Sequence, residues 1–196
     1  MSMEHNGERE RLIAEYRAKT APLGVMVWQG SAEQLAGHVA AWEAMAGLSE
    51  VPVALELREL YPAFCTALEG HGIVLVDPVS PEQMRNAPIG ISVARLAVAE
   101  TGSTLLAEET LADRSISLLP RAQAIVCRIS DLVASLDEAG VVLREMALAP
   151  GRNMTTLVTG PSRTADIERV LTVGVQGPGQ VVVLFVDEEN GKEVAT

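Results

Sequence analysis

The stretch Val25-Met-Val-Trp28-Gln-Gly30-Ser31-Ala-Glu-Gln34 indicates how this chain folds. Its apolar run Val25–Trp28 predicts a strand, which Gly30 ends. Ser31 and Gln34 have the S-x-x-Q spacing of a capping box, in which each side chain accepts a hydrogen bond from the other residue's backbone N–H, so a helix should begin here. A strand followed directly by a helix is the repeating unit of α/β proteins.

The rest of the chain repeats this alternation of short apolar runs with amphipathic segments. The expected helices are one from Ser31 to about Gly47, one over Pro62–Glu69, and a long one capped by Ser130-Asp131 with Leu132, Leu136, Ala139, Leu143 and Met146 on one stripe. The other expected strands are Val51–Leu57, Ile73–Val76, Ile89–Ala94, Leu96–Ala99, Ser103–Ala107, Ala124–Cys127, Thr155–Val158 and Val181–Val186.

This order of elements predicts the α/β fold class: a single domain with a mostly parallel open sheet and helices on both faces. Residues 1–20 are polar with a sparse apolar stripe of Leu12, Ile13 and Tyr16. They are expected to form a peripheral N-terminal helix or arm, open to a role in dimer contact, beside an α/β domain over residues 21–196.

Composition narrows the class of protein. The chain has 196 residues, 48% of them hydrophobic, so it can bury one sizeable core. Its net charge of −11 and lack of a basic run disfavour nucleic acid and anionic membranes as partners. The polar N-terminus predicts no signal peptide, and no apolar run is long enough to span a bilayer. Cys65 and Cys127 form no disulfide framework, which fits the cytoplasm, and are too few to hold an iron–sulfur cluster.

The first segment that could carry chemistry is Glu100-Thr-Gly-Ser103, which follows an apolar run. In an open α/β sheet the carboxyl ends of the strands line the ligand crevice. A carboxylate there could act as a base or a nucleophile. The alternative is an ordinary solvated turn carboxylate.

The second segment is Thr159-Gly-Pro-Ser162-Arg-Thr-Ala-Asp166-Ile-Glu168, after the apolar run Thr155–Val158. Its polar residues predict a helix start, whose free N–H groups and hydroxyls suit a carboxylate or phosphate, with Arg163 adding a bidentate contact. Against this, Ser, Thr and Asp are common capping residues, and the carboxylates of Asp166 and Glu168 would repel an anion.

The third segment, Gly174-Val-Gln-Gly-Pro-Gly179, is glycine-rich but lacks the Lys and spacing of a P-loop and the GxGxxG spacing of dinucleotide-binding proteins. The three histidines, His5, His38 and His71, are scattered and lie outside these segments. No metal site is therefore expected.

The same segments carry a resemblance to a known family. Glu100-Thr-Gly-Ser103 is similar to the E-T-G-T motif of the lactate-utilisation protein C family (LUD domain), and Ser117-Leu-Leu-Pro120 resembles its S-L-L-P segment. The run from Thr159 to Glu168 matches the family's T-G-P-S-x-T-A-D-I-E almost letter for letter, and Gly174-Val-Gln-Gly-Pro178 resembles its G-V-H-G-P. The resemblance covers about residues 85 to 186.

This resemblance implies a fold like that of NagB, RpiA and the CoA-transferases. It also implies a place in a system that oxidises L-lactate to pyruvate, in which partner subunits hold the iron–sulfur clusters. The chain departs from the family at Gln123 and Gln176, where relatives often have His. A glutamine can make the hydrogen bonds of a neutral imidazole but does not titrate near pH 7.

Three hypotheses for function remain open. The chain is a lactate-system subunit that binds a small carboxylate, another anionic ligand or iron–sulfur partner proteins; or a CoA-transferase-like enzyme that uses Glu100 on an acyl or sugar substrate; or a ligand-sensing or assembly module. A homo-oligomer is compatible with each.

The candidate site residues follow from the same segments. The candidate catalytic residue is Glu100, and the candidate ligand-binding residues are Thr101, Gly102, Ser103, Thr159, Gly160, Ser162, Arg163, Thr164, Asp166, Gln176 and Gly177. Glu100 and Ser162–Asp166 are expected to border one crevice, at the carboxyl ends of neighbouring strands.

Overall fold

The structure is a computed structural model that describes residues 2–78, 80–85, 87–148, 154–165, 171–174 and 177–187. Its strands are β1 (Met26–Gly30), β2 (Glu50–Pro52), β3 (Val74–Val76), β4 (Ile89–Val98), β5 (Ser103–Glu108), β6 (Ala122–Arg128), β7 (Leu132–Val133), β8 (Met154–Val158), β9 (Arg163–Ala165), β10 (Leu171–Val173) and β11 (Gln180–Val186). In the part of the chain described, no helix is both long enough and apolar enough to span a membrane.

The helices are α1 (Ser2–Thr20), α2 (Ala32–Ala40), α3 (Leu57–Leu60), α4 (Pro62–Gly70), α5 (Pro81–Arg85), α6 (Leu111–Leu118) and α7 (Leu136–Leu148). Three short 3₁₀ turns, η1 (Ala21–Leu23), η2 (Glu43–Met45) and η3 (Ile129–Asp131), connect some of them to strands. The capping box predicted at Ser31 and Gln34 is present at the start of α2.

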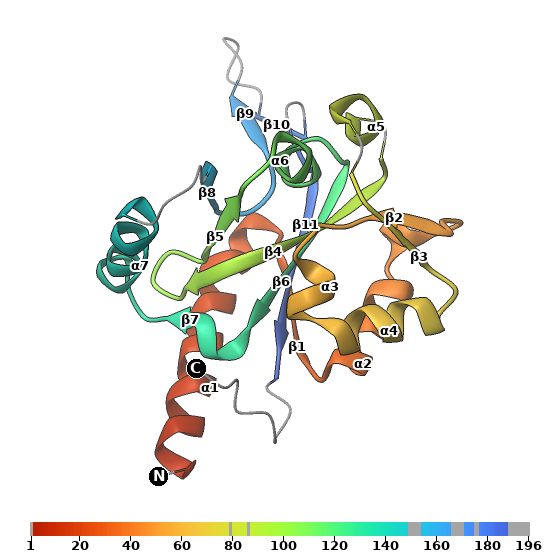
Figure 1. The fold of residues 1–196 in the computed structure, drawn as a ribbon. Coiled ribbons are helices and arrows are strands. Elements are labelled where there is room, and N and C mark those ends of the chain that lie inside the picture. The colour runs from red at the N-terminus through yellow and green to blue at the C-terminus, as the bar shows by residue number, and fades with distance from the viewer. Residues whose placement is uncertain are drawn as a thin grey trace.

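The main sheet is mixed but mostly parallel, as the sequence predicts. Its order is β1-β11-β6-β4-β5-β8, with β7 also paired to β4. The strands β1, β11, β6, β4 and β7 run parallel, and β5 is antiparallel to both β4 and β8. Two small sheets, β2 with β3 and β9 with β10, complete the fold, and the β9–β10 hairpin projects from the top of the molecule (Figure 1).

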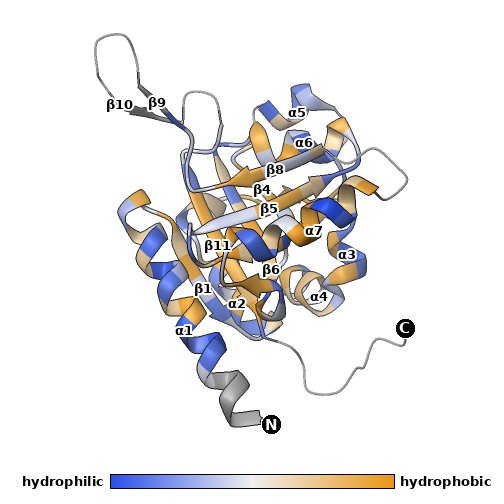
Figure 2. Cartoon of the chain, turned by 90° about the vertical axis from the view of Figure 1, so that its left-hand side faces the viewer, coloured by the Kyte–Doolittle hydropathy of each residue, from blue (hydrophilic) through white to orange (hydrophobic). Residues whose placement is uncertain are grey.

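Strand β11 shows how the sheet is buried on two faces. Val182 and Leu184 belong to a core cluster with α2 and α4, while Val183 and Phe185 belong to a second cluster with α1. Successive side chains of a strand point to opposite faces, so this division places helices on both sides of the sheet. Figure 2 shows α1 on one side of these apolar strands and α3 and α4 on the other.

Helix α1 contributes its apolar stripe to the second cluster. Leu12, Ile13 and Tyr16 are almost fully buried, and the Tyr16 ring meets the Phe185 ring edge-on at 5.2 Å between centroids. Arg17 and Lys19, which follow Tyr16 in the helix, are exposed. The helix therefore packs through one face against the sheet.

Two predicted strands prove to be one. The runs Ile89–Ala94 and Leu96–Ala99 join into the ten-residue strand β4, whose pairing with β5 shifts register between Ala94 and Leu96. Arg95 stands at this bulge and is exposed. An extra residue in one strand turns the following side chains to the other face, which explains why the sequence pattern breaks here.

The predicted strand Val51–Leu57 was too long, and the predicted place of Ile73–Val76 in the main sheet was wrong. β2 ends at Pro52, although the Val53 N–H still donates to the Val76 carbonyl at 3.0 Å, and Leu57 already begins α3. β3 pairs with β2 in a separate small sheet, which touches the main sheet through a bridge between Val53 and Ile91.

The predicted helix boundaries at two places were also wrong. α2 ends at Ala40 rather than near Gly47, because the chain turns to bury Trp42 and Met45 in the core. Ser130-Asp131 does not cap a helix: these residues lie in η3, and β7 pairs with β4 before α7 begins at Leu136.

We expect Tyr16→Ala to lower the free energy of unfolding by about 3–5 kcal/mol, because it empties an aromatic position fully enclosed between α1 and the sheet. The control Arg17→Ala, on the exposed face of the same helix, should change it by less than about 0.5 kcal/mol. Urea unfolding followed by circular dichroism measures both. A loss below about 1 kcal/mol for Tyr16→Ala would show that α1 is dispensable to the fold.

Candidate functional site

Glu100 lies in the turn between β4 and β5 and binds the start of α7. Its Oε2 accepts a hydrogen bond of 3.0 Å from the backbone N–H of Leu136, the first residue of that helix. The first N–H groups of a helix have no partner within the helix, and a negative charge beside them is favourable. The carboxylate is exposed, yet one of its oxygens already has a structural partner.

A chain of three hydroxyls connects the first segment to the second. The Thr101 hydroxyl donates to Ser103 Oγ at 2.8 Å, and Ser103 Oγ lies 2.6 Å from Thr159 Oγ1. Ser103 is almost fully buried, Thr101 is half-buried and Thr159 is exposed. The outer hydroxyls can therefore meet a ligand, while Ser103 holds them in place.

Two glycines let the backbone approach the end of α1 closely. Gly102 has φ 67°, and a Cβ there would lie 2.7 Å from Thr20 Cγ2. Gly160 has φ 86°, and its Cβ would lie 3.2 Å from side-chain atoms of Leu23 and Val25. Both positions combine a left-handed backbone with little space, which explains glycine in both motifs. The turn at Gly102 is also beside Lys19, whose Cβ is 3.1 Å from the same position.

The second segment and the glycine-rich third segment also lie side by side. The Ser162 N–H donates to the Pro178 carbonyl, and the Gly174 N–H donates to the Ser162 carbonyl, both at 2.8 Å. A Cβ on Gly177 would approach Ser162 Cβ to 3.0 Å. The Arg163 guanidinium donates to the Leu23 carbonyl at 2.8 Å, so the second segment contacts η1, the turn that follows α1.

The predicted helix start at Ser162–Asp166 was wrong. Arg163–Ala165 forms β9, which pairs antiparallel with β10, and the ladder hydrogen bonds take the place of a helical turn. Asp166 and Gln176 lie outside the described residues, as does the side chain of Thr164. Within the described residues 162–165, no helix N-terminus is present to bind an anion.

Glu100 and Thr159 lie at one edge of the sheet, as expected, but at the ends of strands that are not neighbours. Strands β4 and β8 run in the same direction, with β5 between them, so the turn containing Glu100 and the residue Thr159 lie at one edge of the sheet. The two strands are therefore not direct neighbours. The residues that contact a ligand remain a prediction.

Gln123 is buried rather than exposed to a ligand. Its side chain is 1% exposed, and Nε2 donates to Ser92 Oγ at 3.2 Å across β6 and β4. A neutral amide suits this position, because an ionised group would lose its hydration without a counter-ion. Gln123 thus acts within the sheet.

The candidate site residues that the sequence predicted, where the structure describes them, do not line the cavity found in the structure. This cavity has a volume of about 410 Å³. It is lined by Ala54, Leu55, Glu56, Glu59, Leu60, Ser92, Val93, Arg95, Ala107, Glu108, Glu109, Thr110 and Asp113. Among the described residues, no group of three or more His, Cys, Asp or Glu could hold a metal ion.

Two carboxyl groups of this cavity have a raised pKa. Burial raises the pKa of Glu56, against the lowering effect of Arg95, and burial also raises the pKa of Glu108, against Ser117 and Arg114. Neither Glu56 nor Glu108 was predicted from the sequence. The sequence feature that could have indicated Glu108 is its position directly after the apolar run Ser103–Ala107.

The fold and the motif geometry define an α/β protein in which two polar motifs lie against the end of the N-terminal helix and the turn that follows it, and a third motif packs on the second. Residues 80–186 match the model of the LUD domain. The chain therefore belongs to the LUD-domain family.

Several proteins are similar to this chain. It is 36% identical to Lactate utilization protein C of Shouchella clausii over 112 residues, which cover 56% of this chain and 48% of that protein. Over 110 residues it is 31% identical to Lactate utilization protein C of Bacillus subtilis (55% and 45% covered), and over 108 residues 32% identical to the uncharacterized protein YkgG of Escherichia coli (54% and 47%). The matched part spans about half the length of these curated relatives.

A solved structure supports the fold. The crystal structure of a DUF162 family protein from Deinococcus radiodurans superposes with a TM-score of 0.65, covering 91% of this chain and 98% of that one. The two sequences are 22% identical, so this likeness concerns the fold alone.

We expect Glu100→Ala to lower the free energy of unfolding by about 1 kcal/mol, because the N–H of Leu136 and the start of α7 lose an anionic acceptor. Glu100→Gln keeps an acceptor oxygen in the same place and should change it by less than about 0.5 kcal/mol. Urea unfolding of both variants measures the difference. Equal stability of the two variants would show that the hydrogen bond to α7 contributes nothing.

Proposed function

We propose that this chain is a component of a lactate-utilisation system and that its motif-bearing edge binds a small carboxylate. The single observation that supports the location is the hydrogen bond between Ser103 and Thr159, which joins two motifs 56 residues apart. Both motifs lie within residues 80–186, which match the LUD-domain model, and the relatives named Lactate utilization protein C match 55–56% of the chain.

The groups at this edge suit a carboxylate. The hydroxyls of Thr101 and Thr159 stand at the accessible ends of the hydroxyl chain. Arg163 is exposed and has one N–H on the Leu23 carbonyl, so its other N–H groups can bind an anion. Lys19 adds a second positive charge beside the turn. Among the described residues of this edge, two cations and two hydroxyls thus stand against the carboxylate of Glu100.

Glu100 is better suited to positioning than to attack on a substrate. Its hydrogen bond to Leu136 fixes the carboxylate against α7. A nucleophilic carboxylate needs a free oxygen directed at the reacting carbon, and the hydrogen bond restricts that orientation. Loss of turnover of an acyl or sugar substrate on substitution of Glu100 would instead support the hypothesis of a CoA-transferase-like enzyme.

In this proposal the iron–sulfur chemistry belongs to partner subunits. Cys65 belongs to the core cluster on one face of the sheet and Cys127 to the cluster on the other. Both are buried, and burial raises the pKa of both thiols, which opposes the thiolate form that clusters need. The two cysteines thus do not fit as ligands of one cluster, and no step of this proposal uses one.

Ligand stabilisation tests the proposal. We expect L-lactate or pyruvate at about 100 times its Kd to stabilise the wild-type protein by about 2.7 kcal/mol, which raises Tm by roughly 5–10 °C. Lactamide, which has the same shape without the charge, should give no shift. Arg163→Gln should weaken the effect about tenfold or more, while the matched control Arg144→Gln on α7 should leave it unchanged. Thr159→Val should weaken it less, since it removes a neutral hydroxyl.

Two results would contradict the proposal. One is an equal Tm shift with lactamide and with lactate, which would mean that the carboxylate is not recognised. The other is an equal loss of binding in Arg163→Gln and Arg144→Gln, which would place the effect in the net charge of the protein rather than at this edge.

A further inference from the structure

The cavity of about 410 Å³ lies where β5 leaves the edge of β4. β5 pairs with β4 from Ala94 to Val98, while on the same edge Ile91 is bridged to Val53. Between these two pairings, Ser92 and Val93 line the cavity. In Figure 1 this part of β4 faces the viewer, between α3, α6 and β5.

Contacts on two sides hold the residues at the rim of this cavity. On one side Arg95, the residue at the β4 bulge, binds Glu56 at 2.9 Å. On the other side the carboxylate of Asp113 accepts from the Leu55 N–H at 3.1 Å and from the Thr110 hydroxyl at 2.7 Å. The walls are thus held by interactions from separate elements.

Glu108 lines the cavity, and its buried carboxylate makes no hydrogen bond in the described part of the structure. The residue is 7% exposed. The nearby Ser117 hydroxyl donates to the Arg114 carbonyl at 3.0 Å instead. A buried, unpaired carboxylate costs free energy, so a group that binds it would relieve a strain already present in the fold.

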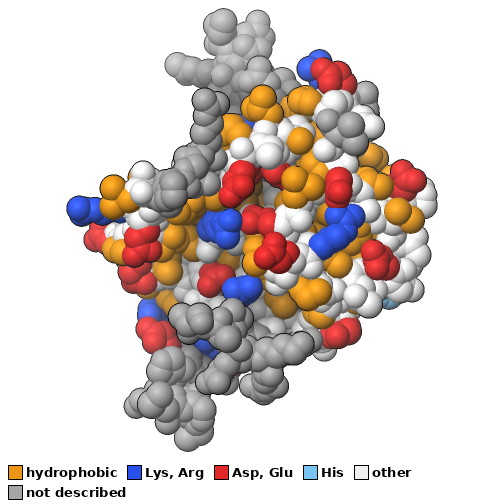
Figure 3. Space-filling model, in the orientation of Figure 1, with side chains coloured by type: hydrophobic (Ala, Val, Ile, Leu, Met, Phe, Trp, Pro, Cys, Tyr) orange, Lys and Arg blue, Asp and Glu red, His pale blue; other side chains and the backbone are white. Residues whose placement is uncertain are grey.

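The charge that lines the cavity is mostly negative. Among the described residues, five with carboxylates line it: Glu56, Glu59, Glu108, Glu109 and Asp113. Arg95, the basic side chain among these lining residues, is already paired with Glu56. In Figure 3 red atoms lie in the middle of the face with blue atoms beside them.

We propose that this cavity binds a small organic cation that carries a primary amine. An ammonium group offers three N–H donors, which suit the unpaired oxygens of Glu108, while the exposed carboxylates of Glu59 and Glu109 add negative charge to the lining. The volume is that of a molecule rather than of a bare ion, and within the described residues no set of carboxylates converges as metal ligands do. An anion would be repelled by the lining.

Binding of an ammonium group should lower the pKa of Glu108. Burial raises this pKa above its ordinary value, while Ser117 and Arg114 lower it in part. A cation placed beside this carboxyl favours its ionised form, so near pH 5, where part of the group is protonated, binding of the amine should release a proton.

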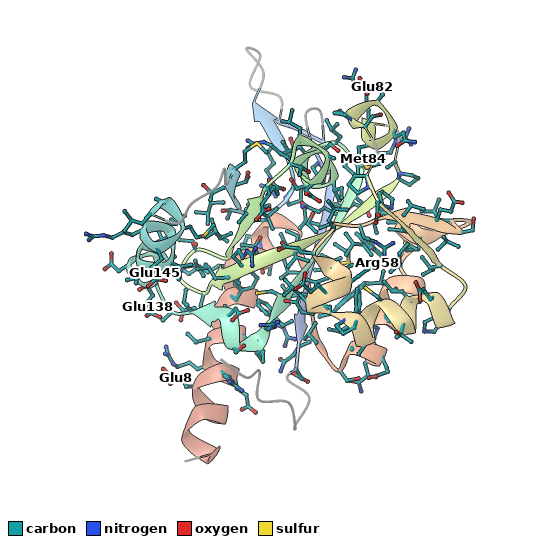
Figure 4. The ribbon with its side chains drawn as sticks, viewed as in Figure 1. Glu8, Arg58, Glu82, Met84, Glu138 and Glu145 are labelled. Atoms are coloured by element: carbon teal, nitrogen blue, oxygen red, sulfur yellow. The ribbon has the colours of Figure 1, made fainter. Side chains whose placement is uncertain are left out.

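Isothermal titration calorimetry with 1,4-diaminobutane at pH 7 and 150 mM NaCl tests the proposal. We expect one binding event per chain for wild type and none for 1,4-butanediol, which has the same length without charge. Glu108→Gln should weaken binding about tenfold or more, and so should the exposed pair Glu59→Gln/Glu109→Gln. The matched control Glu145→Gln on α7, labelled at the left of Figure 4, should bind like wild type.

Proton release near pH 5 gives a second readout that folding defects do not imitate. Titrations at pH 5 in two buffers that differ in ionisation enthalpy should differ in heat for wild type, and differ less for Glu108→Gln. Equal binding in wild type and Glu108→Gln would overturn the proposal. So would equal weakening in Glu145→Gln, which would mean attraction by net charge alone, or tighter binding of Mg²⁺ than of the diamine at this cavity.

Stability against pH checks that Glu108 is buried as described. A carboxyl whose pKa is raised in the folded state stabilises the protein below its unfolded pKa and loses this contribution as the pH rises through the folded pKa. Glu108→Gln should therefore match wild type in Tm at pH 5 and exceed it at pH 8. If wild type were the more stable at pH 8, Glu108 would have a partner and the argument for a bound cation would fail.

Discussion

The bulge in β4 is the constraint on which the arrangement of this protein depends. Before it, Ile91 and Val93 face the core cluster under α2 and α4; after it, Leu96 and Val98 face a small cluster with α7, and Ala97 joins the cluster under α1. One extra residue thus shifts the alternation by one position. Without this shift, β4 could not serve both the parallel core of the sheet and the antiparallel extension through β5 and β8.

The bulge also explains why the two polar regions lie at different ends of one strand. Beyond it, β4 leads into the turn with Glu100, and the pairing of β5 with β8 brings Ser103 to Thr159. At the bulge itself, Arg95 is directed outward and pairs with Glu56. The same local irregularity therefore positions the hydroxyl-lined edge and opens the acidic cavity. Bulges often occur beside functional sites because they redirect single side chains.

Much of the fold could be predicted because its causes are local. The strands β6 and β11 are short, apolar and rich in β-branched residues, and the capping box at Ser31 follows from two side chains three positions apart. The bulge, the pairing of Leu132-Val133 with β4, and the strand at Arg163–Ala165 depend on partners distant in sequence. Local preference could not reveal them, and at Ser162 it favoured a helix cap over a hairpin.

The candidate site was predictable only where a motif is continuous in sequence. Glu100, Ser103 and Thr159 were found because glycine-containing turns follow apolar runs. The acidic cavity was not, since its carboxylates come from α3, β5 and α6, and no spacing in the sequence relates Glu56 to Glu108. Only the pairing of the strands brings them together, and only burial reveals which of them has lost its hydration.

The two regions differ in the sign of the ligand that they favour. A chain of net charge −11 repels anions at long range, so an edge that binds a carboxylate needs local cations, which Arg163 and Lys19 supply. The cavity needs no such correction, because the charge of the whole protein already attracts a cation towards it. The net negative charge thus disfavours carboxylate binding at the motif-bearing edge and favours amine binding in the cavity. Raising the ionic strength should therefore weaken amine binding. It should affect carboxylate binding less, because salt screens the general repulsion of the anion as well as its attraction to the local cations.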